Sequence, residues 1–203
     1  MAKQVMDIRP GKGMTLSQSN EHLRVSLHGA KTSSRSLNID PTRDLLNFEI
    51  TQGCRVVPVD KRTSIPKRIR ENLKKRGIED PNKKYKKLGL EPKIRTVANF
   101  ILGGSRDQMH RLAFGNQKVN LERGADNSAI KRMPEIENWA KDMYRFMSDR
   151  FGGKNIAAFV VHLDETNPHI HCTVLPITEQ NKFSWKQVMV GENNSKFEYQ
   201  KRT

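Results

Sequence analysis

Two short apolar runs separated by one turn constrain the fold of this chain more than any other feature. The first run covers residues 155–163 and the second covers residues 168–176, and both have the length and composition of strands. Between them lies Asp164-Glu165-Thr166-Asn167, a stretch of turn-forming residues that Pro168 closes. The pattern predicts a hairpin whose first strand, apolar on both faces, lies inside a sheet.

Half of the six histidines in the chain fall within this hairpin. His169 and His171 are two residues apart, so a strand places both rings on one face. His162 ends the first strand, and the hairpin would fold it back over the other two. Three neutral imidazoles from two neighbouring strands predict a divalent-metal site with positions left open for a substrate.

The charge of the chain favours a polyanionic partner. The net charge is +15 over 203 residues, and the isoelectric point is near 10.0. Residues 61–95 contain fourteen Lys and Arg against four Asp and Glu, so two thirds of the excess lies in about a sixth of the chain. This favours nucleic acid first and an anionic membrane surface second. The candidate residues for contacting a nucleic acid are Lys67, Arg68, Arg70, Lys74, Lys75, Lys83, Lys84, Lys86 and Lys87.

Length and composition predict a single domain over residues 1–203. The chain ends at Lys201-Arg202-Thr203 without a helix-stop signal, so we expect this domain to be the N-terminal part of a longer protein. No apolar run approaches the roughly 20 residues of a membrane-spanning helix, and no apolar signal region begins the chain. Of the two cysteines, Cys172 lies within an apolar strand pattern, which favours a buried free thiol over a disulfide. These features predict a cytoplasmic protein.

The remaining elements predict an α+β fold. Strands are expected over residues 3–8, 45–51 and 94–102, and helices over residues 65–77 and 134–152. Residues 80–89 read as a lysine-rich loop, residues 11–40 as a polar segment, and residues 105–131 are ambiguous. We expect a central antiparallel sheet with helices packed on one face. The other face would carry the three hairpin histidines and Arg95.

The stretch His-Leu-Asp-Glu-Thr-Asn-Pro-His-Ile-His resembles the H-x-D-E-x-x-P-H-x-H motif of the MobV (Pre/Mob) relaxases of mobilizable plasmids and transposons. These enzymes belong to the HUH endonucleases, whose palm is an antiparallel sheet. Residues 19–24, 37–41 and 46–49 are also similar to the N-terminal region of that family.

The resemblance implies a strand- and sequence-specific nick at an origin of transfer. The enzyme would become joined to the 5′ phosphate of the cut strand and would later rejoin the strand. The DNA would be a single strand with a flanking hairpin or duplex, gripped by the basic residues 61–95. The resemblance implies Mn²⁺ or Mg²⁺, whereas imidazole ligands alone favour Zn²⁺ or Ni²⁺. Residues beyond 203 would mediate any dimer.

Covalent chemistry of this kind needs a nucleophile. Most HUH enzymes use tyrosine, but Tyr85, Tyr144 and Tyr199 lie in unpromising segments. The MobV family implies a histidine near the N-terminus, followed closely by Asn and Arg. Here His22 lies in Asn20-Glu21-His22-Leu23-Arg24, with the Asn before the His, and His28 is the alternative.

Three further residues are candidates for catalysis. Arg24 and Arg95 would neutralise charge on the scissile phosphate. Glu165, or its neighbour Asp164, would orient a ligand histidine or accept a proton.

Other functions remain compatible with the sequence. A rolling-circle replication initiator would share the metal site but use a tyrosine. A metal-dependent phosphodiesterase would activate water and form no covalent adduct. A basic nucleic-acid-binding module would use the histidines structurally. A closed structural site wants a fourth ligand, and Cys172 faces the wrong side of its strand for that role.

Overall fold

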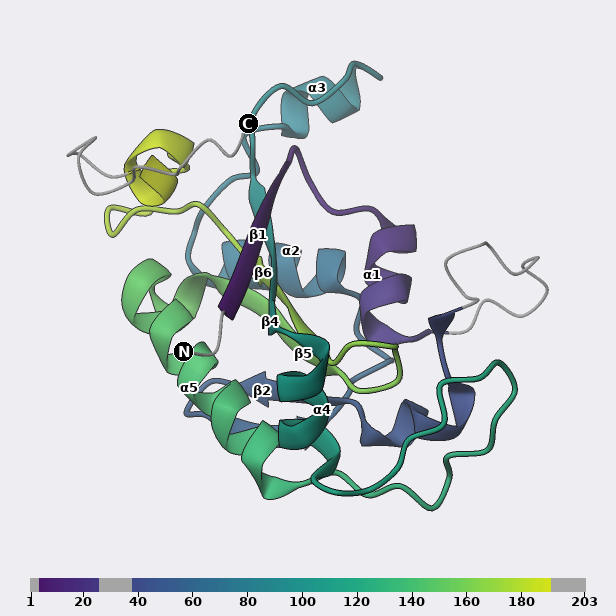
Figure 1. Cartoon of the computed structure of the whole chain (residues 1–203). Coiled ribbons are helices and arrows are strands. Elements are labelled where there is room, and N and C mark those ends of the chain that lie inside the picture. Colours follow the sequence, from purple (N-terminus) through teal and green to yellow (C-terminus); the bar gives the residue numbers. More distant parts are fainter. Residues whose placement is uncertain (1–3, 26–37, 191–203) are drawn as a thin grey trace, which may run out of the picture.

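The computed structural model describes residues 4–25 and 38–190, and within them one six-stranded sheet forms the centre of the fold (Figure 1). The strand order is β1-β4-β6-β5-β2-β3, and every neighbouring pair is antiparallel. The expected α+β fold and the central hairpin, β5 with β6, are therefore confirmed. The strands are β1 (Gln4–Gly11), β2 (Phe48–Thr51), β3 (Arg55–Pro58), β4 (Val97–Gly104), β5 (Ile156–His162) and β6 (His169–Val174).

Helices α4 (Arg106–Phe114) and α5 (Pro134–Phe151) pack on one face of the sheet (Figure 1). The buried stripe of α5 follows helical spacing, and it meets the sheet at Phe159, Ile170 and other apolar side chains of the main core. The helix begins at Pro134 and stops before Gly152, which has a positive φ of 82°. These are the boundaries that the sequence predicted.

Helices α1 (Leu16–Leu23) and α2 (Ile65–Lys75) pack on the opposite face, which also carries the hairpin histidines. Leu23 and Ile65 bury Ala158 and Val160 of β5, and the Ile65 amide donates to Ser19 Oγ at 2.9 Å. The helices are thus not confined to one face. Small apolar side chains on the histidine face of β5 would otherwise be exposed, and α1 and α2 cover them.

The sequence did not predict α1, which lies in the polar segment of residues 11–40, nor the helices of two further segments. The ambiguous residues 105–131 include α4, and the lysine-rich residues 80–89 include the short helix α3 (Lys83–Lys87). Buried Asn82 links α3 to the segments that follow β1 and precede β4, because its amide donates to the carbonyls of Lys12 and Ile94. The shorter helical turns are η2 (Pro41–Leu46), η3 (Gly153–Asn155) and η4 (Lys186–Val190).

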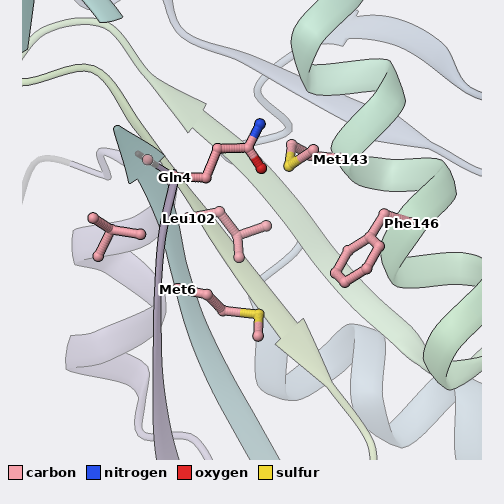
Figure 2. A pocket seen from close by; sticks show the side chains of 7 residues that line it. Gln4, Met6, Leu102, Met143 and Phe146 are labelled. Carbon is pink, nitrogen blue, oxygen red and sulfur yellow. The ribbon is translucent and has the colours of Figure 1, made fainter. Parts of the chain in front are cut away.

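An apolar pocket of about 180 Å³ opens between the edge strand β1 and helix α5 (Figure 2). Met6, Leu102, Met143 and Phe146 line it, together with Gln4, Val5 and Gly103. Met6 pairs with Leu102, whose side chain lies in the main core under α5. The pocket therefore belongs to the face without the histidines.

Among the described helices, none has the length and apolar content needed to cross a membrane.

Candidate metal centre and active site

The hairpin brings three imidazoles together on one face of the sheet. His162 lies opposite His169 in the β5–β6 register, and His171 lies opposite Val160. The ring centroids of the three histidines are 4.7–5.3 Å apart in pairs. One nitrogen from each ring can be chosen so that all three lie within 4.8 Å of one another. This spacing allows the three rings to share one cation.

The hydrogen bonds of the rings fit a metal site. A carbonyl oxygen can only accept, so His169 Nδ1 donates to the Asn167 carbonyl at 2.9 Å. In the neutral ring this leaves the electron pair on Nε2, which lies 2.9 Å from His171 Nε2. His162 Nδ1 is buried and has no hydrogen-bond partner. The contact of His169 Nδ1 with a carbonyl is typical of ligand histidines, whose second ring nitrogen is commonly fixed by such a hydrogen bond.

The surroundings lower the pKa values of His169 and His171 and so favour their uncharged forms. Burial, and then the charge of His162, lower the pKa of His169. Burial lowers the pKa of His171 well below its usual value, and the neighbouring histidines add to the effect. Because a metal binds imidazole through a free electron pair, a lowered pKa keeps the rings ready for coordination.

Helix α1 places His22 against the histidine cluster. The His22 ring stacks on His171 with a centroid distance of 4.1 Å and an interplanar angle of 28°. Its carbonyl accepts a hydrogen bond from His162 Nε2 at 2.8 Å. Burial and the charges of His162, Arg24 and His169 lower the pKa of His22 to about 3. The other candidate, His28, lies outside the described residues.

Arg24 ends α1 in the left-handed conformation, with a φ of 52°, and its side chain turns toward the hairpin. The guanidinium binds both carboxylate oxygens of Asp164, at 2.7 and 2.9 Å, and Glu165 Oε1 at 2.5 Å. The Arg24 side chain is only 6% exposed and that of Asp164 is fully buried. The structure therefore joins Arg24 to two carboxylates beside the cluster.

Asn47 completes this contact from the start of β2. Its amide nitrogen donates to Asp164 Oδ2 at 2.8 Å, and its oxygen accepts from the Leu163 amide at 2.7 Å. Sequence reasoning did not single out Asn47. The alternation of apolar and polar residues that buries Phe48 did place Asn47 on the opposite, polar face of the strand, and this was the sequence feature that could have identified it.

Glu165 is negatively charged beside the histidines. Burial alone would raise its pKa, but the nearby His162 ring and the charges of His169 and Arg24 outweigh this effect and hold the pKa at about 2. Its Oε1 lies 3.7 Å from His162 Nδ1.

Comparison with known proteins relates the chain to enzymes of plasmid recombination. The family model described as plasmid recombination enzyme, Mob_Pre, matches residues 130–202. A plasmid recombination enzyme of Bacillus thuringiensis is 25% identical over 158 residues, which are 77% of this chain and 27% of that protein. A type 1 plasmid recombination enzyme of Staphylococcus aureus is 40% identical over 53 residues, which are 26% of this chain and 13% of that protein.

A solved structure has the same fold. It is the Mn-bound MobM relaxase domain (MOBV; Mob_Pre) in complex with oriT DNA of plasmid pMV158. Its TM-score is 0.61 at 21% identity, and the match covers 91% of this chain and 76% of that one. The chain is thus similar to Mob_Pre plasmid recombination enzymes, and it shares the fold of a MOBV relaxase domain. It spans less than a third of the length of either curated relative.

The remaining predicted site residues that the structure describes lie away from the histidine cluster. The guanidinium carbon of Arg95 lies 5.4 Å from the ring centroid of Trp185. Arg95 is six residues before Ile101, which pairs with His171 in the sheet. At about 3.3 Å per residue it lies roughly 20 Å along β4. Tyr144 is buried under the opposite face against Phe159, and Tyr85 lies on α3. Tyr199 lies outside the described residues.

The basic residues predicted to contact DNA divide into those that pair with a carboxylate and those that do not. Arg68 binds Glu49 at 2.7 and 3.0 Å, and the Glu49 side chain is only 4% exposed. Three lysines form exposed ion pairs, Lys67 with Glu71, Lys83 with Glu79 and Lys86 with Asp80. The other five have no carboxylate of a described residue within 4.0 Å: Arg70, Lys74, Lys75, Lys84 and Lys87.

Proposed function

We propose that this chain nicks one strand of DNA at an origin of transfer and rejoins it, through a covalent link between the 5′ phosphate and His22. One observation carries the proposal: the His22 ring stacks directly on His171, a member of the three-histidine cluster. The shared fold supports it, since the MobM relaxase domain was solved with oriT DNA and manganese.

The chemistry needs a cation and a nucleophile. A divalent cation held by His162, His169 and His171 would polarise a nonbridging oxygen of the phosphate as a Lewis acid. An unprotonated ring nitrogen of His22 attacks the phosphorus and forms an N–P bond. The P–O3′ bond breaks, and its electron pair goes to the 3′ oxygen, which takes up a proton. The reverse reaction reseals the strand, because the N–P link retains the energy of the broken bond.

We assign Arg24 and Glu165 to positioning. The Arg24 guanidinium is occupied by two carboxylates, so it ties the end of α1, and with it His22, to the hairpin. A carboxylate with a pKa of about 2 is a weak base, so Glu165 serves better as a partner of Arg24 than as a proton acceptor. Arg95 is too distant for phosphate neutralisation and would contact DNA farther along the strand.

We assign the grip on the DNA backbone to the cations of α2 and α3. Exposed ion pairs contribute little, so Lys67, Lys83 and Lys86 can exchange their carboxylates for phosphates. Arg68 is the exception, because its release would leave the buried charge of Glu49 without a partner.

The test is a covalent-adduct assay. The protein is incubated with Mn²⁺ and single-stranded DNA from the origin region, labelled at the 3′ end because the enzyme retains the downstream fragment. After denaturation, we expect labelled protein whose link is destroyed by acid, as a phosphoramidate on histidine is. His22→Ala should abolish the adduct, and Tyr85→Phe should leave it unchanged.

Two outcomes would contradict this proposal. An acid-stable link would indicate a tyrosine and favour a replication initiator. Cleavage without any labelled protein would indicate a water-activating phosphodiesterase. Of the described tyrosines, neither Tyr85 nor Tyr144 lies by the histidines, so the initiator is the less favoured alternative.

A further inference from the structure

The turn that joins β5 to β6 has an unusual hydrogen-bond arrangement. Its residues 163–167 lie outside the strand ladder, where carbonyls commonly face water. Here all five consecutive carbonyls accept a hydrogen bond from the protein. The donors, in order from Leu163 to Asn167, are Arg43 Nη1 at 2.5 Å, the Asp40 amide at 2.7 Å, Arg43 Nη2 at 3.3 Å, His110 Nε2 at 2.8 Å and His169 Nδ1 at 2.9 Å.

Arg43 supplies two of these five bonds from a buried position. It lies on η2, is only 2% exposed, and its Nε donates to Asp40 Oδ2 at 2.7 Å. The Asn127 side-chain amide donates to the same oxygen of Asp40 at 2.8 Å and so fixes the position of that carboxylate. The planar guanidinium thus spans the carbonyls of Leu163 and Glu165, which a lysine ammonium at one point cannot do.

His110 supplies the fourth bond from helix α4. Its Nε2 must be protonated, because the Thr166 carbonyl can only accept. The edge of its ring packs on Phe114, with centroids 5.4 Å apart, so the side chain is held from two sides. The proposed reaction makes no direct use of His110.

These contacts lead to the metal cluster in two steps. The peptide that His110 holds at Thr166 is followed by Asn167, whose carbonyl accepts from His169 Nδ1. That bond determines which nitrogen of His169 is protonated, and therefore directs the free electron pair of Nε2 toward His171. If the turn moved, His169 Nδ1 would lose the carbonyl that it donates to, and the ring could adopt the other tautomer.

We propose that Arg43 and His110 are positioning residues, which hold the hairpin turn so that the Asn167 carbonyl keeps His169 in its metal-binding tautomer. The effect on catalysis rests on the proposed function, whereas the effect on the tautomer does not. Neither residue touches the reacting atoms.

The first experiment measures the His169 tautomer in metal-free protein, by ¹⁵N NMR of the histidine rings. We expect His169 to be protonated at Nδ1 in the wild-type chain. His110→Ala should convert it to a mixture of tautomers, and His110→Gln should restore it because the amide keeps a donor. Arg111→Ala, an exposed neighbour on α4, is the matched control. An unchanged His169 signal in His110→Ala would overturn the inference.

The second experiment titrates Mn²⁺ and follows the free ion by electron paramagnetic resonance. Loss of an outer contact of a ligand typically weakens metal binding by about 10–100-fold, so His110→Ala, one contact farther out, should weaken it about tenfold. Arg43→Lys should weaken it at least as much. Equal affinity in His110→Ala and wild type would also count against the inference.

The two proposals fail in distinguishable ways. If wild-type protein forms no DNA adduct but His110→Ala still changes the tautomer, the nicking function is wrong and the positioning role stands. If the adduct forms normally and neither the tautomer nor the Mn²⁺ affinity responds to His110→Ala, the positioning role is wrong.

Discussion

At the scale of single residues, burial separates ion pairs that have nearly the same length. Arg24 and Asp164 meet at 2.7 Å with side chains 6% and 0% exposed. Arg145 and Asp142 meet at 2.6 Å with side chains 58% and 66% exposed. Removing one partner of a buried pair leaves an uncompensated charge away from water, whereas an exposed charge is solvated at once.

We therefore predict that Arg24→Met lowers the free energy of unfolding by about 3–5 kcal/mol, the usual cost of breaking a buried pair. Arg145→Met should change it by about 0–1 kcal/mol. Urea denaturation of both variants, followed by circular dichroism without metal, measures the difference. Equal stabilities of the two variants would show that Asp164 does not depend on Arg24.

The sequence singled out both Arg24 and Asp164 as candidates but did not predict that they bind each other. Asp164 is 140 positions away, and a carboxylate beside a histidine motif reads equally well as a turn cap or as a catalytic group. The same holds for Asn47 and Arg43, whose contacts with the turn lie 116 to 122 positions away in sequence. Local periodicity carries no information about such bonds.

At the scale of elements, the sequence predicted the helices and strands in which apolar residues recur at regular spacing. The β5–β6 hairpin and α5 were foreseen because alternation and the three-to-four spacing mark their buried faces. Helix α1 was missed because its buried residues are only Ser19 and Leu23, while Leu16 is 60% exposed. A helix that buries a serine and one leucine shows almost no hydrophobic stripe.

Helices α2 and α3 allow a test of which cations contact DNA. Removing both Lys74 and Lys75 by alanine substitution should weaken DNA binding and lower the slope of log affinity against log salt. Each lost phosphate contact removes about 0.7 from the slope for single strands and about 0.9 for duplex. A fluorescence-anisotropy titration at several salt concentrations measures both effects.

The matched control for this pair is Lys141→Ala with Arg145→Ala on α5, which covers the face opposite the histidines. This control should leave the salt slope unchanged. Arg68→Ala should instead lower the stability of the fold, because Glu49 loses its buried partner. A slope that falls equally in the α2 and α5 pairs would show that the DNA is not bound on the α2 side.

At the scale of the whole molecule, the histidine cluster should make the metal-free protein sensitive to acid. The pKa of His22 is lowered to about 3, and those of His169 and His171 are also lowered, so the folded state binds protons on these rings less readily than the unfolded chain does. In the unfolded chain they bind protons below about pH 6.5. The unfolded state therefore gains protons first, and stability falls as the pH drops through 6.5.

The slope of this loss identifies the groups that cause it. Between about pH 6 and 3, His22 alone contributes up to about 1.4 kcal/mol per pH unit. Glu165, with a folded pKa of about 2, adds a loss in the same direction below about pH 4.5. Urea denaturation of metal-free protein at pH 7.5, 6.5 and 5.5 should give decreasing free energies of unfolding, with a shallower decrease in His22→Gln. If the free energy of unfolding stays constant over this range, the folded cluster takes up protons as readily as the unfolded chain does. The packing of His22 on His171 would then be too loose to present a fixed nucleophile to a phosphate.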